Sequence, residues 1–289
     1  MRISVNGSAL YFDVEGLGLR PAGARMRELP TLVLLHGGPG VDHTIYKPAF
    51  SALAEVAQLV YLDHRGCGRS DASDPAHWNL AQWADDLKLF CDSLGIQRPL
   101  VYGASFGGMV AMTYATRHPG HPGGLILDST AARPGGHAEA KVAMFARLGG
   151  PAAGELAHRR FVLGDTSEEV LAAWLQIAVP LYTRRPADAE EIERALVRRD
   201  VTAFFNRPGG EARSMDLLPD LARLQCRTLV LGGLLDPMLP IECQRELAAA
   251  VPPALLSYHE FDDCGHVTLK DGPAEVMALV RQFVVASAA

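Results

Sequence analysis

Apolar and polar residues follow two different periods along this chain, and segments with the two periods alternate. Near the start, apolar and polar residues alternate over positions 2–14 on either side of Asn6-Gly7, a dipeptide that accommodates the positive φ angles of a tight turn. We therefore expect a β-hairpin there. Short continuous apolar runs, typical of strands buried on both faces of a sheet, follow further along. They occupy residues 31–35, 58–62, 100–102, 124–127, 228–231 and 255–261.

Segments with helical periodicity separate most of these runs. Between Asn79 and Gly95, apolar residues recur every three to four positions, which predicts an amphipathic crossover helix that ends at the glycine. A last helix is expected from about Pro273 to Val285. Buried strands that alternate with helices are typical of an α/β protein with a mostly parallel sheet.

Residues 132–222 interrupt this alternation and have mostly helical patterns. Thr166-x-x-Glu169 forms a predicted capping box before an apolar helical segment. We therefore predict a helical cap at 132–222, inserted after the sixth strand, and a core domain made of 1–131 and 223–289. Turns are expected at three glycine- and proline-rich stretches, residues 134–136, 149–151 and 208–210.

The sequence Gly103-Ala104-Ser105-Phe106-Gly107 lies between a predicted strand and a predicted helix. A Gly-x-Ser-x-Gly pattern in this context predicts a strained strand-to-helix turn that exposes the serine hydroxyl at the edge of the sheet. Residues with side chains at the two glycine positions would collide with the neighbouring strand or helix. Ser105 is therefore the candidate nucleophile.

A serine nucleophile needs a histidine base, which in turn is oriented by a carboxylate. Asp236 follows the strand at 228–231, and His266 follows the strand at 255–261. Because parallel strands present such loops along one edge of a sheet, we expect both side chains to meet Ser105. Asp128, at the end of the strand at 124–127, is the rival acid.

A glycine-rich segment, His36-Gly37-Gly38-Pro39-Gly40, follows the strand at 31–35. Acyl transfer needs amide donors for the oxyanion of the tetrahedral intermediate, and we expect the amides of Gly38 and Phe106 to supply them. The alternative is a glycine-rich turn without a ligand. The segment lacks the spacing of either common phosphate-binding loop.

Composition narrows the classes of protein that remain. The chain has 289 residues, of which 48% are hydrophobic, and a net charge of -6 without a basic stripe, so we expect no nucleic-acid partner. No apolar run approaches the ~18 residues of a membrane span, and no signal segment is evident at the start, so we expect a cytoplasmic protein without a membrane association. The five cysteines are widely spaced and the histidines lack a zinc-binding pattern, so no disulfide framework or metal is expected.

Three blocks of this sequence resemble consecutive motifs of the proline iminopeptidase group within the α/β-hydrolase superfamily. They are His36-Gly37-Gly38-Pro39-Gly40, Asp63-His64-Arg65-Gly66-Cys67-Gly68-Arg69-Ser70 and Gly103-Ala104-Ser105-Phe106-Gly107-Gly108. The resemblance implies a sheet of about eight strands flanked by helices, a cap over the nucleophile, and release of an N-terminal residue from small peptides or amides without a cofactor.

In that group, acidic residues from the cap and near the catalytic aspartate hold the free ammonium group of the substrate. Glu211 resembles a cap glutamate of some members, although it is also interpretable as a solvated turn residue, and Asp236 is followed by Pro237 where relatives can carry a second glutamate. Apolar residues of the cap, Trp174 among them, would form either a roof over the substrate or the core of the cap itself.

Three functional hypotheses therefore remain for a small-molecule or short-peptide substrate. They are an aminopeptidase of the proline iminopeptidase type, an esterase or lactonase with the same three side chains, and a binding protein of the same fold that does not turn over a substrate. The sequence leaves the oligomeric state open.

Overall fold

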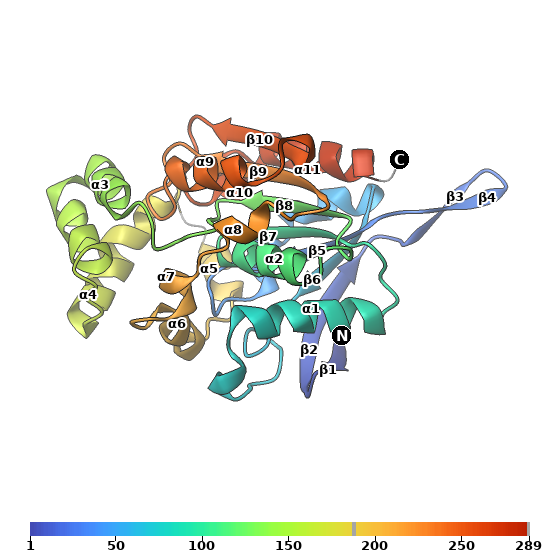
Figure 1. The fold of residues 1–289 in the computed structure, drawn as a ribbon, viewed down its shortest axis with the longest axis horizontal. Coiled ribbons are helices and arrows are strands. Elements are labelled where there is room, and N and C mark those ends of the chain that lie inside the picture. The colour runs from blue at the N-terminus through green and yellow to red at the C-terminus, as the bar shows by residue number, and fades with distance from the viewer. Residues whose placement is uncertain (187–188, 288–289) are drawn as a thin grey trace.

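A computed structural model describes residues 1–186 and 189–287. In this part of the chain, eight strands form one twisted sheet in the order β1-β2-β6-β5-β7-β8-β9-β10 (Figure 1). Strands β1 and β2 pair antiparallel, β2 pairs antiparallel with β6, and the remaining neighbours are parallel. The strands are β1 (Arg2–Val5), β2 (Ser8–Glu15), β5 (Thr31–Leu35), β6 (Gln58–Leu62), β7 (Leu100–Ala104), β8 (Gly124–Asp128), β9 (Arg227–Gly233) and β10 (Leu256–Phe261).

Helices cover both faces of this sheet, because successive side chains of a strand point to opposite faces. Val33 and Leu35 of β5 join the apolar cluster that contains residues of α1, α2 and α9. Leu32 and Leu34 join the cluster on the other face, with residues of α11 and of the short helical segment 49–55. These helices are α1 (Leu80–Ser93), α2 (Phe106–Arg117), α9 (Ile241–Ala250) and α11 (Pro273–Ser287), and α10 (Thr268–Asp271) precedes the last one.

One hairpin that the sequence analysis did not predict lies outside the main sheet. Strands β3 (Leu19–Ala22) and β4 (Arg25–Glu28) form a hairpin that is exposed along its whole length and extends away from the rest of the protein (Figure 1). The amide of Leu29 donates to the carbonyl of Gly18 at 2.9 Å, so the two ends of the hairpin lie together.

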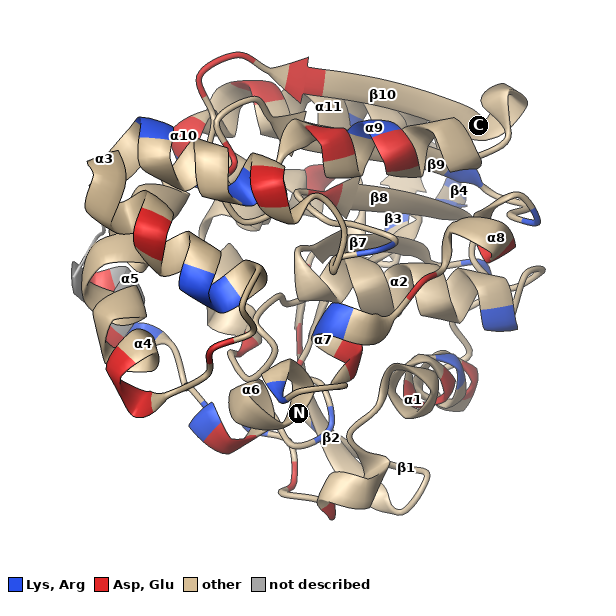
Figure 2. Cartoon of the chain, turned by 60° about the vertical axis from the view of Figure 1, so that its left-hand side comes forward, with Lys and Arg blue, Asp and Glu red and all other residues tan. Residues whose placement is uncertain are grey.

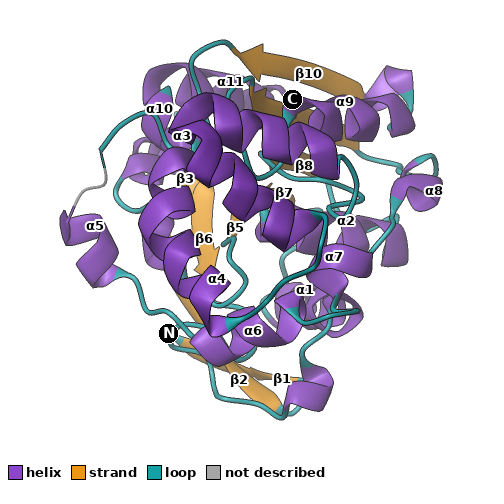
Figure 3. Cartoon of the chain, turned by 90° about the vertical axis from the view of Figure 1, so that its left-hand side faces the viewer, coloured by secondary structure: helices purple, strands orange, loops and turns teal. Residues whose placement is uncertain are grey.

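The long segment between β8 and β9 is helical, as its pattern predicts, and it follows the sixth strand of the sheet. Several of its helices lie in front of the central strands when the molecule is viewed from that side, and others lie to the left and right of them (Figure 3). They are α3 (Ala138–Phe161), α4 (Glu168–Ala173), α5 (Ala189–Arg194), α6 (Arg199–Asn206), α7 (Glu211–Ser214) and α8 (Leu218–Leu221). Gly150, with φ of 77°, breaks α3 at a predicted turn. The exact division at 132 and 222 stays a prediction, since Leu221 of α8 packs within the core cluster.

The start of α4 corrects one prediction. The N-terminal cap is Ser167 rather than Thr166, and its hydroxyl accepts from the amide of Val170 at 3.4 Å. Asp165 accepts from the amide of Ser167 at 2.9 Å and pairs with Arg159, so the turn before the helix is fixed one residue later than the capping-box pattern indicates.

Among the described residues, no helix combines the length and the apolar character that a bilayer span needs.

Candidate active site

Ser105 lies at the sharp turn between β7 and α2. Its backbone angles, φ of 53° and ψ of -120°, fall where residues with a side chain are strained. Neighbouring groups hold this conformation: the amide of Ser105 donates to the carbonyl of Asp128 at 2.9 Å, and the hydroxyl of Thr130 donates to the carbonyl of Ser105 at 2.6 Å.

The two glycines of the turn are required by close backbone contacts. A Cβ atom at Gly103 would lie 2.4 Å from the carbonyl oxygen of Gly107, and one at Gly107 would lie 2.1 Å from the carbonyl oxygen of Leu35. Both distances are well below van der Waals contact, so any side chain would push α2 away from β5 or β7. The glycine positions therefore let the helix approach the strands closely enough to present the Ser105 hydroxyl.

His266 bridges Ser105 and Asp236. Its Nε2 atom lies 3.0 Å from Oγ of Ser105, and its Nδ1 atom lies 2.8 Å from Oδ2 of Asp236. The other carboxylate oxygen of Asp236 accepts from the amides of Met238 and Leu239 at 2.8 and 2.9 Å, so this buried carboxylate is fixed in orientation. The structure thus brings together three residues that span 161 positions of the sequence.

Electrostatics around His266 favour its charged form. Burial lowers the pKa of His266, but the negative charge of Asp236 and the hydrogen bond with it raise the pKa, and the net pKa lies above the ordinary value of 6.5. Asp128 adds a smaller increase, whereas the positive charge of Lys141 opposes it. The arrangement can accept a proton from Ser105 and stabilise the resulting imidazolium.

The loop that carries His266 is held by the inserted helical segment. The amide of His266 donates to the carbonyl of Tyr182 at 2.7 Å, and the two rings lie edge to face at 5.6 Å. Asp271 accepts from the amide of Gly265 at 2.8 Å with one oxygen and from the amide of Arg184 at 2.9 Å with the other. The sequence did not indicate Tyr182 or Asp271, because neither belongs to a motif.

Asp128 is not the carboxylate that orients His266. Its oxygens accept from the hydroxyl of Tyr102 at 2.6 Å and from the hydroxyl of Thr268 at 2.7 Å. Burial raises the pKa of Asp128, and the hydrogen bonds lower it by less. Asp128 therefore anchors α10, two residues beyond His266, and acts on the histidine only at a distance.

Gly38 and Phe106 both lie beside Ser105 in the wall of a cavity. Phe106 is the first residue of α2, so its amide has no acceptor within the helix. A Cβ atom at Gly37 would lie 3.2 Å from Cβ of Ser105, which shows how closely the glycine-rich loop approaches the hydroxyl. The roles of both amides remain predictions.

The two residues predicted to bind substrate lie elsewhere. A carboxylate oxygen of Glu211 accepts from the amide of Leu80 at 2.7 Å, at the N-terminus of α1, and Glu211 is not among the residues that line the cavity. Trp174 packs edge to face with Phe145 and Phe161 and donates from Nε1 to the hydroxyl of Tyr182 at 2.9 Å. It belongs to the internal core of the inserted helices, which is the second of the two interpretations of these aromatic residues.

The cavity beside Ser105 has a volume of about 200 Å³, which suits a small substrate. Its wall combines apolar groups such as Met109 and Phe161 with three basic side chains, those of Lys141, Arg160 and Arg213. No carboxylate is among the described residues that line it. The sequence did not single out these basic residues, since nothing local distinguishes them from other lysines and arginines of the chain.

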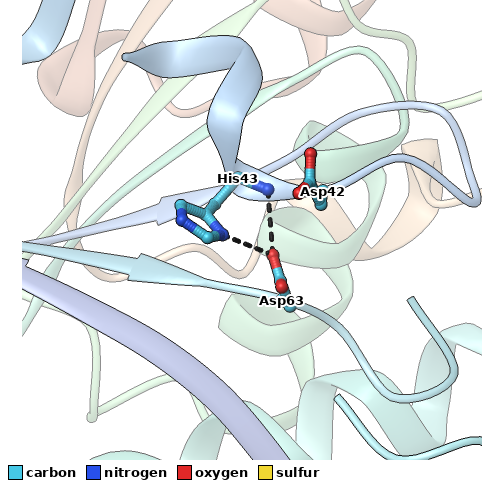
Figure 4. Close-up of side chains that lie close together, drawn as sticks. All are labelled: Asp42, His43 and Asp63. Atoms are coloured by element: carbon cyan, nitrogen blue, oxygen red, sulfur yellow. Dashed lines mark hydrogen bonds and ion pairs between the residues drawn. The ribbon is translucent and has the colours of Figure 1, made fainter. Parts of the chain in front are cut away.

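One group of side chains in the described part of the chain has the composition of a metal site: Asp42, His43 and Asp63 (Figure 4). One oxygen of Asp63 accepts from the amide of His43 at 2.9 Å and lies 2.7 Å from its ring Nδ1 atom, as the dashed lines show. The amide of Arg69 donates to the other oxygen at 2.8 Å, and Asp42 pairs with the guanidinium of Arg69 at 2.5 Å. The carboxylates are thus bonded to donors of the chain, and the group ties the loop after β5 to the loop after β6.

Comparison with known proteins identifies the class to which this fold and site belong. The family model for the alpha/beta hydrolase fold matches residues 30–273. The chain therefore belongs to the α/β-hydrolase fold family, and the predictions of fold class and of a hydrolase-class enzyme are confirmed.

Individual relatives have differing activities. A proline iminopeptidase of Levilactobacillus brevis is 29% identical, and the match covers 92% of each chain. A cis-3-alkyl-4-alkyloxetan-2-one decarboxylase of Shewanella oneidensis is 27% identical over 98% of this chain and 87% of its own. The crystal structure of a proline iminopeptidase of Mycobacterium smegmatis has a TM-score of 0.79 at 22% identity, covering 100% of this chain and 98% of that one. The resemblance to the proline iminopeptidase group is confirmed, whereas the substrate is not defined by these relatives.

Proposed function

We propose that the protein is a serine hydrolase that cleaves a small ester or lactone through an acyl-enzyme, with Ser105 as nucleophile, His266 as general base and Asp236 as the carboxylate that orients it. His266 takes the proton of the Ser105 hydroxyl, whose oxygen attacks the carbonyl carbon of the substrate. His266 then donates that proton to the leaving oxygen. Water hydrolyses the acyl-enzyme with the same histidine as base.

The pair of contacts at His266 carries this proposal. Contacts of 3.0 Å to the Ser105 hydroxyl and 2.8 Å to Asp236 lie within the range for proton transfer and for orientation of the ring. The amides of Gly38 and Phe106 would stabilise the oxyanion of the tetrahedral intermediate, a contribution of about 2.7 to 4 kcal/mol per donor in comparable sites.

The charge of the cavity favours an ester or lactone over a peptide with a free amino group. An aminopeptidase needs a carboxylate to hold the ammonium group of its substrate, and burial of an unpaired ammonium costs several kcal/mol. Glu211, the candidate for that role, caps α1 instead, and the described cavity wall carries cations. Aminopeptidase activity remains the second candidate, because the proline iminopeptidase of L. brevis is similar along most of both chains.

A fluorophosphonate tests whether Ser105 is a nucleophile. We expect a covalent adduct on Ser105 by mass spectrometry, and we expect Ser105→Ala to lose both the adduct and at least about a thousandfold in kcat/KM for an aryl ester. Ser129→Ala is the matched control, because Ser129 is a buried serine at the end of a neighbouring strand. A folded wild-type protein that forms no adduct would instead support a binding protein without turnover.

A second experiment separates the two activities. It compares an aminoacyl arylamide with a free amine, the N-acylated form of that arylamide, and a simple aryl ester. We expect the aryl ester to have the highest kcat/KM. Preference for the arylamide with the free amine over both other substrates would instead establish an aminopeptidase.

A further inference from the structure

Three basic side chains share the cavity beside Ser105, and we call Lys141, Arg160 and Arg213 the cation cluster. Lys141 and Arg160 belong to α3, and Arg213 belongs to α7. Basic positions on both helices are marked in blue in Figure 2. Two segments that are distant in the sequence therefore place positive charge at one site.

The polar atoms of this cluster have few partners within the protein. Lys141 donates to the carbonyl of Pro134 at 2.5 Å, and its Nζ atom lies 4.8 Å from the centre of the Phe161 ring. The guanidinium of Arg160 lies 4.6 Å from the centre of the Trp174 ring. Nε of Arg160 and one terminal nitrogen of Arg213 are buried and lack a hydrogen-bond partner among the described residues. These two nitrogens are therefore unsatisfied within the described part of the protein.

No described carboxylate pairs with the cation cluster. Burial lowers the pKa of Lys141; the charges of Cys243 and Asp236 oppose this decrease, and the smaller effects of Arg213 and Arg160 add to it. Burial also lowers the pKa of Arg160; Tyr182 opposes this decrease, and the smaller effect of the Arg213 charge adds to it. The three cations repel one another in a partly dry site, which is unfavourable unless an anion is bound.

Elsewhere in the chain, the buried Arg65 is paired with a carboxylate, whereas the arginines of the cavity have no such partner among the described residues. Nε and Nη2 of Arg65 donate to the two oxygens of Asp86 at 2.7 and 2.8 Å, and both side chains are buried. Structural arginines of this kind are satisfied by a carboxylate of the protein. In the cavity, the partly buried Arg160 and Arg213 have no described carboxylate partner, so an anionic group of a ligand would complete their charge pairing.

We propose that the cation cluster binds a carboxylate of the substrate, so that the substrates are esters or lactones that carry a carboxylate group. The proposal rests on the hydrolase function proposed above and names its substrate class. The guanidinium groups of Arg160 and Arg213 can each donate hydrogen bonds to a carboxylate, and Lys141 adds a further positive charge at the same cavity wall. The volume of about 200 Å³ limits the substrate to a small molecule.

Matched ester pairs test this specificity in the wild-type protein. One pair is the para-nitrophenyl hemiester of glutarate and its methyl ester, which places the charge in the acyl group. The other is meta-acetoxybenzoate and its methyl ester, which places the charge in the leaving group. We expect the charged member of at least one pair to have a kcat/KM that is about tenfold to a hundredfold higher, as for hydrogen bonds to a buried charged group. Equal or faster hydrolysis of the neutral member in both pairs would overturn the proposal.

Variants then assign the preference to the cluster. We expect Arg160→Gln and Arg213→Gln each to reduce the charged-to-neutral ratio of kcat/KM by about tenfold. Arg147→Gln is the control, since Arg147 is an exposed arginine of the same helix α3, and we expect it to keep the wild-type ratio. An unchanged ratio in both of the first two variants would contradict the assignment.

A binding measurement separates this proposal from the hydrolase proposal. We expect glutarate, but not neutral glutaramide, to raise the Tm of wild-type protein and of Ser105→Ala, and this effect to be lost in Arg213→Gln. If the fluorophosphonate does not label Ser105 but glutarate still binds, the hydrolase function fails and the carboxylate site stands. If labelling succeeds and glutarate has no effect, the carboxylate site is wrong.

Discussion

Asp236 raises the pKa of His266, and Lys141 lowers it. Its raised pKa means that the imidazole stays protonated to a higher pH than an ordinary histidine, and only the neutral ring can accept the proton of Ser105. We therefore expect kcat/KM to fall as the pH drops, with the midpoint of this acidic limb above 6.5. Lys141→Met removes a charge that lowers the pKa of His266, so the limb should move to higher pH. A shift to lower pH would contradict this account, and Arg147→Gln should leave the limb in place.

Single residues also differ in how far their positions can be predicted from the sequence. Ser105, Asp236 and His266 could be placed together because each follows the carboxyl end of a parallel strand, and the topology of the sheet brings those ends to one edge. The positions of Glu211 and Arg213 could not be predicted, although they are two residues apart. Both residues belong to the short helix α7. The orientation of α7 against α1 depends on tertiary packing, which no local sequence pattern encodes.

At the scale of elements, Asp271 joins α10 to the inserted segment after Tyr182. The two carboxylate oxygens of Asp271 accept from the amides of Gly265 and Arg184, and Asp271→Asn replaces one of these oxygens with an NH2 group that cannot accept, which frees the His266 loop to move. We expect kcat to fall by up to about a hundredfold, as for displacements of about 1 Å at a reacting group, with KM changed less. The rate of fluorophosphonate labelling should fall in parallel. Asp263→Asn, which alters an exposed carboxylate in the same loop, should retain both rates.

A wild-type labelling rate in Asp271→Asn, together with a lowered Tm, would assign Asp271 a role in stability alone.

The strands and helices of the protein differ in how well the sequence predicts them. The buried strands and α1 have patterns strong enough to be recognised, because each is packed on one or two apolar faces. The hairpin of β3 and β4 is exposed on both faces and so lacks an apolar period, and the start of α4 is set by Asp165 rather than by the capping box.

For the whole molecule, the exposed hairpin is separable from the site. Its ends meet at the bond between Leu29 and Gly18, so residues 19–28 can be replaced by Asn-Gly as a two-residue turn. The shortened loop costs little entropy to close, and the hairpin contributes few packed side chains. We expect kcat/KM for an aryl ester to stay within about twofold and the free energy of unfolding to change by less than about 1 kcal/mol, measured by urea titration. A loss of activity would reveal a contribution of the hairpin to the site.

The bond from the amide of His266 to the carbonyl of Tyr182 has a consequence for the modularity of this protein. His266, the proposed general base, belongs to the core domain, yet its backbone amide is hydrogen-bonded to the inserted segment. A chimera that replaces residues 132–222 with the corresponding region of a relative would exchange more than a specificity module. The donor region would also have to provide a carbonyl where Tyr182 now provides one, or the transplanted enzyme would recognise a new substrate with a misaligned imidazole.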